Sequence, residues 1–135
     1  MLIAIVGSSK AGNDNLANAL IHSYLSKLDP EKDTIVSGGG TGVDTLVALL
    51  CQELKFKLIE FKPDTLAWEG FKKRNLQIAE KAERVVSFAY PLRNQKWHST
   101  KCYHCANAGR DDNHEKTAGC YTGMKNGNYE VVIIN

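Results

Sequence analysis

The sequence predicts a single α/β domain with a five-stranded, mainly parallel sheet flanked by helices. Apolar runs of strand length alternate with amphipathic segments of helical period along the 135 residues. The first run, Leu2–Val6, has no polar position, which is typical of a parallel strand covered on both faces. Two of the runs lead into glycine-containing turns that open helices. These features indicate strands joined by right-handed helical crossovers.

Five apolar runs predict the strands, and the amphipathic segments between them predict the helices. The strand segments are 2–6, 34–36, 57–61, 85–89 and 129–134. Helices are expected to begin near Asn13 or Asp14, Val43, Phe71 and Gly119. Residues 90–118 lack periodicity and are too long for a plain connection, so we treat them as an insertion within one domain spanning 1–135. Ligands of such folds bind beyond the carboxyl ends of the strands.

Trp68 lies in the loop at 63–70, ahead of the third expected helix. It would serve either as a core residue or as an aromatic plate over a ligand, and the core interpretation is favoured. Cys51 follows Leu50 in the second helix, where a buried thiol acts as a small hydrophobe.

The composition narrows the function classes. The net charge of +2 is too small to favour nucleic acid or an anionic membrane surface as partner. Met1–Gly7 is apolar but lacks a basic flank and is far shorter than a membrane span, so we expect a cytoplasmic protein with no membrane partner. In a reducing compartment, the four cysteines favour a metal site or buried thiols over disulfides.

The turn Ser37–Asp44, with sequence Ser-Gly-Gly-Gly-Thr-Gly-Val-Asp, predicts an anion site. It joins an apolar run to an amphipathic segment, in the order strand, turn, helix. Glycines let backbone N–H groups approach a ligand closely, and a helix N-terminus adds unpaired donors and partial positive charge. Phosphate fits such a corner. The plainer explanation of Thr41 and Asp44 is a T-x-x-D capping box.

Four short motifs carry a resemblance to a known family. Ile-Val-Gly-Ser-Ser at 5–9, the turn at 37–44, Lys-Arg-Asn at 73–75 and Gly-Cys-Tyr-Thr at 119–122 resemble the SLOG superfamily of Rossmann-like proteins. The similarity is greatest to its small YspA/YpsA-related members and the molybdenum-cofactor carrier group, and DNA-processing protein A belongs to the same superfamily. The insertion at 90–118 lies outside the resemblance.

The resemblance implies a nucleotide or nucleotide-derived ligand, bound by a sensor or carrier. Asp44 would cap the helix or accept a ribose hydroxyl, because a free carboxylate repels phosphate. Arg74 would offer its guanidinium to phosphate, its alternative being a solvated helix charge. The implied ligand-binding residues are Gly7, Ser8, Ser9, Gly38, Gly39, Gly40, Thr41, Gly42, Asp44, Arg74, Asn75, Gly119 and Thr122.

The sequence leaves catalysis open. The superfamily's phosphoribohydrolases carry Pro-Gly-Gly-x-Gly-Thr-x-x-Glu, whose glutamate serves glycosidic cleavage. Here Ser37 replaces the proline and Thr45 the glutamate, and Asp44 is turned by about 100° from that position. A binding module is therefore favoured, and a nucleotide-processing hydrolase using Asp44 or Glu69 is the alternative. Nucleic-acid handling is disfavoured by charge, and a homodimer stays open.

The insertion and the start of the next expected helix form a C-x2-C-x8-H-x5-C pattern: Cys102, Cys105, His114 and Cys120. Three thiolates and one imidazole suit tetrahedral Zn²⁺, and metal binding would order a segment with little apolar content. His98 and His104 are alternative ligands. Free thiols in a lid and a redox C-x-x-C pair are the competing interpretations. Zinc on Cys120 would place the insertion across the pocket mouth, whereas a Cys120 facing the pocket would leave the metal one ligand short.

Overall fold

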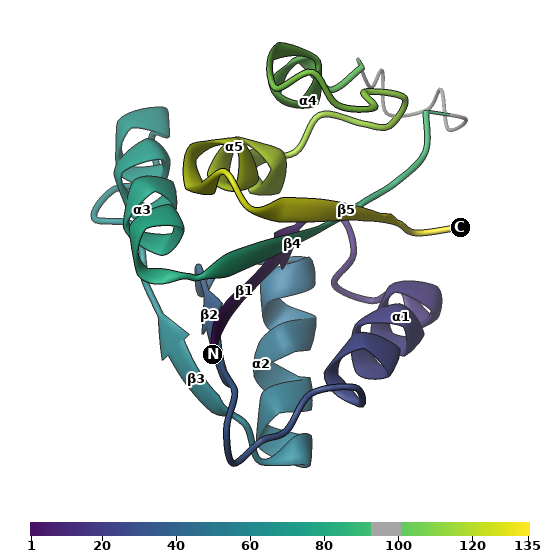
Figure 1. Cartoon of the computed structure of the whole chain (residues 1–135), viewed down its shortest axis with the longest axis vertical. Helices are drawn as coiled ribbons and strands as arrows, with labels where there is room; N and C mark the ends of the chain where they lie inside the picture. Colours follow the sequence, from purple (N-terminus) through teal and green to yellow (C-terminus); the bar gives the residue numbers. More distant parts are fainter. Residues whose placement is uncertain (93–100) are drawn as a thin grey trace.

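The computed structural model describes residues 1–92 and 101–135 and shows one five-stranded, fully parallel sheet of order β3-β2-β1-β4-β5 (Figure 1). The strands are β1 Leu2–Gly7, β2 Thr34–Ser37, β3 Lys57–Glu60, β4 Arg84–Ala89 and β5 Tyr129–Ile133. The helices are α1 Asn15–Leu25, α2 Val43–Leu54, α3 Trp68–Lys81, α4 Tyr103–Asn107 and α5 Ala118–Asn126. The predicted α/β, Rossmann-like fold class is confirmed.

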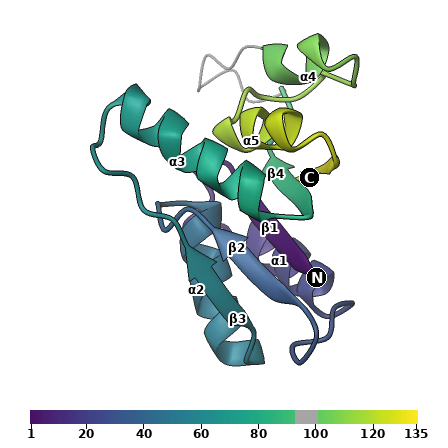
Figure 2. The same ribbon diagram turned by 60° about the vertical axis from the view of Figure 1, so that its left-hand side comes forward.

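The strand order reverses beside β1, the central strand. β1 pairs with β2, for example Ile3 with Ile35, and with β4, where Ile3 lies opposite Arg84. The chain adds β2 and β3 on one side of β1 and then crosses to add β4 and β5 on the other. As a result α1 and α2 cover one face of the sheet while α3 and α5 cover the other (Figures 1 and 2).

The face under α1 and α2 is closed by aliphatic packing. Ile3, Ile5 and Ile35 of the sheet meet Ile21 of α1 and Val47 of α2, and all five are at most 1% exposed. The predicted cap of α1 is Asp14, whose Oδ1 accepts the backbone N–H groups of residues 16 and 17 at 2.9 and 3.4 Å. This half of the molecule follows directly from the hydrophobic pattern.

The opposite face is closed in part by cysteines. Its buried cluster combines aliphatic residues such as Val36 and Ile78 with three fully buried thiols. The three thiols belong to Cys102, Cys105 and Cys120. The core on this side therefore contains polarizable, metal-binding groups where the other side has isoleucine and valine.

Trp68 is not a core residue. It is the first residue of α3, and its side chain is 52% exposed. The first turn of α3 packs beside α5, where the Trp68 ring meets that of Tyr121 edge-on with centroids 5.7 Å apart. The expectation that Trp68 is core was wrong, because its ring lies against Tyr121 at the start of α3 and about half of its surface stays exposed.

In its described part, from residue 101 on, the insertion forms the short helix α4, which packs against α5 (Figure 1). An isolated antiparallel bridge joins Lys101 to Glu115. Glu115 is 3% exposed, and its carboxylate accepts from Lys10 Nζ at 2.9 Å and from the Tyr90 backbone N–H at 3.3 Å. These bonds attach the insertion to the loops after β1 and β4. Over residues 1–92 and 101–135, the helices lack the combination of length and apolar character that a membrane crossing requires.

Candidate metal centre and ligand pocket

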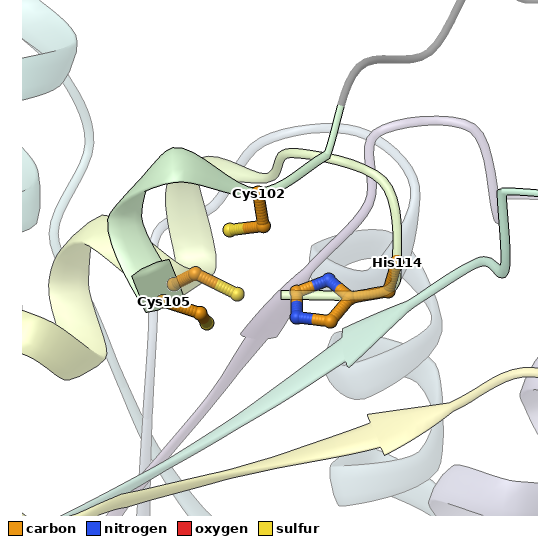
Figure 3. Close-up of side chains that lie close together, drawn as sticks. Cys102, Cys105 and His114 are labelled. Atoms are coloured by element: carbon orange, nitrogen blue, oxygen red, sulfur yellow. The ribbon is translucent and has the colours of Figure 1, made fainter. Parts of the chain in front are cut away.

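The four residues predicted as metal ligands come together. Cys102 caps α4, Cys105 lies within it, His114 is on the returning segment, and Cys120 is in the first turn of α5. Their ligand atoms all lie within 4.8 Å of one another, and all four residues are buried. Figure 3 shows Cys102, Cys105 and His114 with side chains converging on one space. The group is therefore close enough to hold a metal ion.

His114 is oriented as a ligand. Its Nδ1 lies 2.8 Å from the backbone oxygen of Glu115, so this nitrogen donates its proton there. Its Nε2 is buried and finds no hydrogen-bond partner among the described residues. An imidazole held by Nδ1–H presents the Nε2 lone pair, the form that binds metal.

Of the two histidines considered as alternative ligands, His104 lies within the described residues and His98 does not. The His104 ring packs between those of Tyr103 and Tyr121, at centroid distances of 4.2 and 5.4 Å, and is not in the ligand group. Burial lowers the pKa of His104 below its ordinary value. His98 lies outside the described residues.

Hydroxyl groups surround the sulfurs. Ser87 Oγ and Thr117 Oγ1 each lie 3.6 Å from Cys120 Sγ, and Tyr129 OH lies 3.3 Å from Cys105 Sγ. Hydroxyl donors of this kind stabilise thiolates and orient them toward a cation. Sequence reasoning missed all three; Thr117, the N-cap of α5, was visible only as a residue three places before Cys120.

The three thiols influence one another's protonation. The Cys120 hydrogen bond lowers the pKa of Cys102 to about 5, against the effect of burial. The same bond and burial raise the pKa of Cys120, and burial raises that of Cys105. A nearby cation would favour the thiolate forms of the three cysteines.

A small pocket lies where β1 and β2 end, between α3 and α5, with a cavity volume of about 30 Å³. Seven of the predicted ligand residues line it: Gly7, Gly38, Asp44, Arg74, Asn75, Gly119 and Thr122. The remaining six are not part of this lining: Ser8, Ser9, Gly39, Gly40, Thr41 and Gly42. The α5 segment serves both sites, because Gly119 and Thr122 face the pocket while Cys120 between them faces the metal ligands.

Arg74 is not a solvated helix charge. It is 8% exposed, and its Nη1 donates to the Gly38 carbonyl at 2.5 Å while its Nε donates to Asn75 Oδ1 at 2.8 Å. Burial lowers the pKa of Arg74, and the Asp44 charge opposes that shift. A Cβ at Gly38 would stand 2.4 Å from Arg74 Nη1, so this glycine leaves room for the guanidinium.

Asn75 carries an unused donor. It is 3% exposed, and its Nδ2 is buried without a hydrogen-bond partner in the described part of the chain. Buried amide groups are ordinarily paired, so an unpaired one facing a pocket indicates a position for an acceptor atom.

Asp44 is held by the turn itself. Its Oδ2 accepts the Gly40 N–H at 3.1 Å. The expected Thr41–Asp44 capping box was wrong, because the helix N-cap is Gly42, whose φ of +74° and contact with the backbone of Ser8 exclude a side chain. Burial raises the pKa of Asp44, while the Gly40 N–H and the Arg74 charge oppose the increase.

Ser8 joins the first turn to its neighbours. Its N–H donates to Phe88 O at 2.9 Å, its carbonyl accepts the Val43 N–H at 3.0 Å, and its Oγ accepts the Lys10 N–H at 3.2 Å. The N–H groups of Gly40 and Val43 are thus engaged within the protein.

Compared with models of known protein families and with curated proteins, the chain matches none.

Proposed function

We propose that the pocket binds the phosphate-bearing part of a nucleotide or nucleotide-derived ligand, and that a structural Zn²⁺ fixes the insertion beside it. The protein would act as a cytoplasmic sensor or carrier of that ligand. The observation that carries the proposal is the pair of buried donors, Arg74 and Asn75, in a pocket at the carboxyl edge of a parallel sheet. The SLOG resemblance of the lining motifs supports it.

The pocket is small in this structure. Its cavity volume of about 30 Å³ is far below the range of about 300–1,000 Å³ typical of small-molecule sites, so a phosphate group would enter only as the lining side chains move apart. A guanidinium and an unpaired amide N–H both seek acceptor oxygens, which phosphate supplies. The phosphate would occupy the pocket, and the remainder of the ligand would lie outside it along the sheet edge.

Zinc is the proposed metal because of the donor set. Three thiolates and one imidazole form a tetrahedral group that zinc prefers, and four protein ligands leave no open position for chemistry. The ion would therefore be structural. It would supply the charge that lets three adjacent thiols ionise, and it would connect α4, the returning segment and α5.

Calorimetric titration with adenosine monophosphate (AMP) and guanosine monophosphate (GMP) tests the pocket. The sharpest variant is Asn75→Asp, which keeps the acceptor for Arg74 Nε but replaces the unpaired N–H group with a negative oxygen. We expect it to weaken binding by at least about tenfold. Lys72→Gln, an exposed change on the same helix that also lowers the net charge by one unit, is the control and should bind normally. Equal affinities of the two variants, or no binding by the unaltered protein, would contradict the proposal.

A second candidate function is hydrolysis of the ligand. Asp44 lies in the pocket with a raised pKa, a property common among acid–base catalysts. Release of free base from AMP or GMP, lost in Asp44→Asn, would support this function. Binding without turnover would leave the carrier or sensor role.

A further inference from the structure

We propose that Trp68 stacks on the planar base of the ligand whose phosphate occupies the pocket; this inference rests on the proposed function. It assigns the ligand class as a phosphate ester carrying an aromatic base, and it gives a role to an exposed side chain that the fold leaves unexplained. A half-exposed tryptophan at a helix start, 52% accessible, adds little to the core.

Trp68 and the pocket share one face of α3. Trp68 and Asn75 are seven residues apart, which places them on nearly the same side of the helix and about 10 Å apart along its axis. Phe71 lies between them, and the Arg74 guanidinium carbon sits 5.6 Å from the centre of its ring. An apolar path therefore leads from the phosphate donors to the exposed ring.

The second helix of the pocket supports the same ring. Tyr121, which meets Trp68 edge-on, is directly followed by the pocket residue Thr122. Tyr121 is itself 7% exposed and contacts His104, so the partner that holds Trp68 is fixed on its other side. An exposed aromatic ring about 10 Å along the helix from the pocket donors offers a stacking surface for the base of a ligand whose phosphate meets those donors.

The test compares AMP with ribose 5-phosphate, which lacks the base, in calorimetric titrations. We expect Trp68→Ala to weaken AMP binding roughly tenfold and to leave ribose 5-phosphate binding unchanged. Trp68→Phe, which keeps an aromatic face, should retain most of the AMP affinity. Leu66→Ala removes a neighbouring apolar side chain that is 87% exposed and should change neither affinity. In a Trp97→Phe background, Trp68 is the remaining tryptophan, and AMP should quench its fluorescence while ribose 5-phosphate should not.

The outcomes separate this inference from the proposed function. AMP binding that is sensitive to Asn75→Asp but indifferent to Trp68→Ala would overturn the stacking role and leave the phosphate pocket intact. Equal losses for AMP and ribose 5-phosphate in Trp68→Ala would also overturn it, because they would indicate a distorted pocket. Absence of binding for both probes would overturn the proposed function and this inference with it.

Discussion

The two faces of the sheet are covered by side chains of different chemical character. Under α1 and α2, the core consists of isoleucine, valine and leucine, with Cys51 as an ordinary small apolar member. Under α3 and α5, three cysteines take up core positions and are accompanied by a histidine and hydroxyl groups. The first face consists of apolar side chains, while the second also contains four buried residues close enough to hold a metal ion.

Both candidate sites lie on the side of the sheet that α3 and α5 cover. Both the metal ligands and the pocket use α5, and the pocket also uses α3. The aliphatic face has neither site in the described residues. If the proposed function is right, the face under α3 and α5 binds both the metal and the ligand, and the face under α1 and α2 serves the core alone.

The largest contrast is expected from one substitution made on each face. Cys105→Ala removes a metal ligand and should cost more than about 4 kcal/mol of unfolding free energy and abolish bound zinc. Cys51→Ala, at an equally buried position, should cost about 1 kcal/mol and keep the zinc. Urea unfolding and elemental analysis measure both effects. Similar costs for the two variants would show that the cysteines of the second face are simple core residues.

Truncating a buried side chain on the aliphatic face should destabilise the protein without changing its zinc content. Ile21→Ala, at a fully buried site in α1, is expected to cost about 2–5 kcal/mol while zinc content stays at one ion per chain. Hydrogen exchange should accelerate throughout the domain and not specifically in residues 101–120. Loss of zinc in this variant would mean that the two faces are not separable.

The ion pair at the junction of the insertion should have an intermediate effect. Glu115→Gln removes a nearly buried carboxylate, 4% exposed at the side chain, from Lys10 and is expected to cost about 1–2 kcal/mol. Asp64→Asn breaks the Lys73–Asp64 pair, in which both side chains are more than 60% exposed, and should cost at most about 0.5 kcal/mol. Thermal unfolding of the two variants side by side gives the comparison, and equal shifts would argue against a role for Glu115 in attaching the insertion.

The smallest effect concerns the pH dependence of stability. Because burial raises the pKa of Asp44, the folded state holds more protons than the unfolded state between the usual and the raised pKa. Stability contributed by the protonated form is therefore lost as pH rises through that window. Asp44→Asn keeps an acceptor for the Gly40 N–H and should flatten the profile measured by urea unfolding from about pH 4 to pH 8. A profile identical to that of the unaltered protein would contradict the assigned shift.

The same contrast explains what could be predicted from sequence. The strands, the capping of α1 by Asp14 and the aliphatic core follow from hydrophobic period and local hydrogen bonding, which act over a few residues. The metal ligands were predictable because cysteine and histidine at such spacing have few other uses.

The remaining features depend on contacts between distant segments. No local signal indicates that Tyr129 OH would reach Cys105, or that Glu115 would pair with Lys10 across 105 positions. Asp44 was expected to cap its helix, but the backbone of Ser8 occupies that corner and the carboxylate accepts from Gly40 instead. Trp68 was expected in the core for its size, but its ring packs edge-on against Tyr121 of α5 and remains 52% exposed.

X-ray absorption at the zinc edge of the purified protein tests the metal centre most directly. A closed site formed by Cys102, Cys105, Cys120 and His114 Nε2 predicts three sulfur ligands at about 2.3 Å and one nitrogen at about 2.0–2.1 Å. A spectrum dominated by oxygen or nitrogen ligands, or a protein that carries no zinc after metal-replete expression, would contradict the account of the second face.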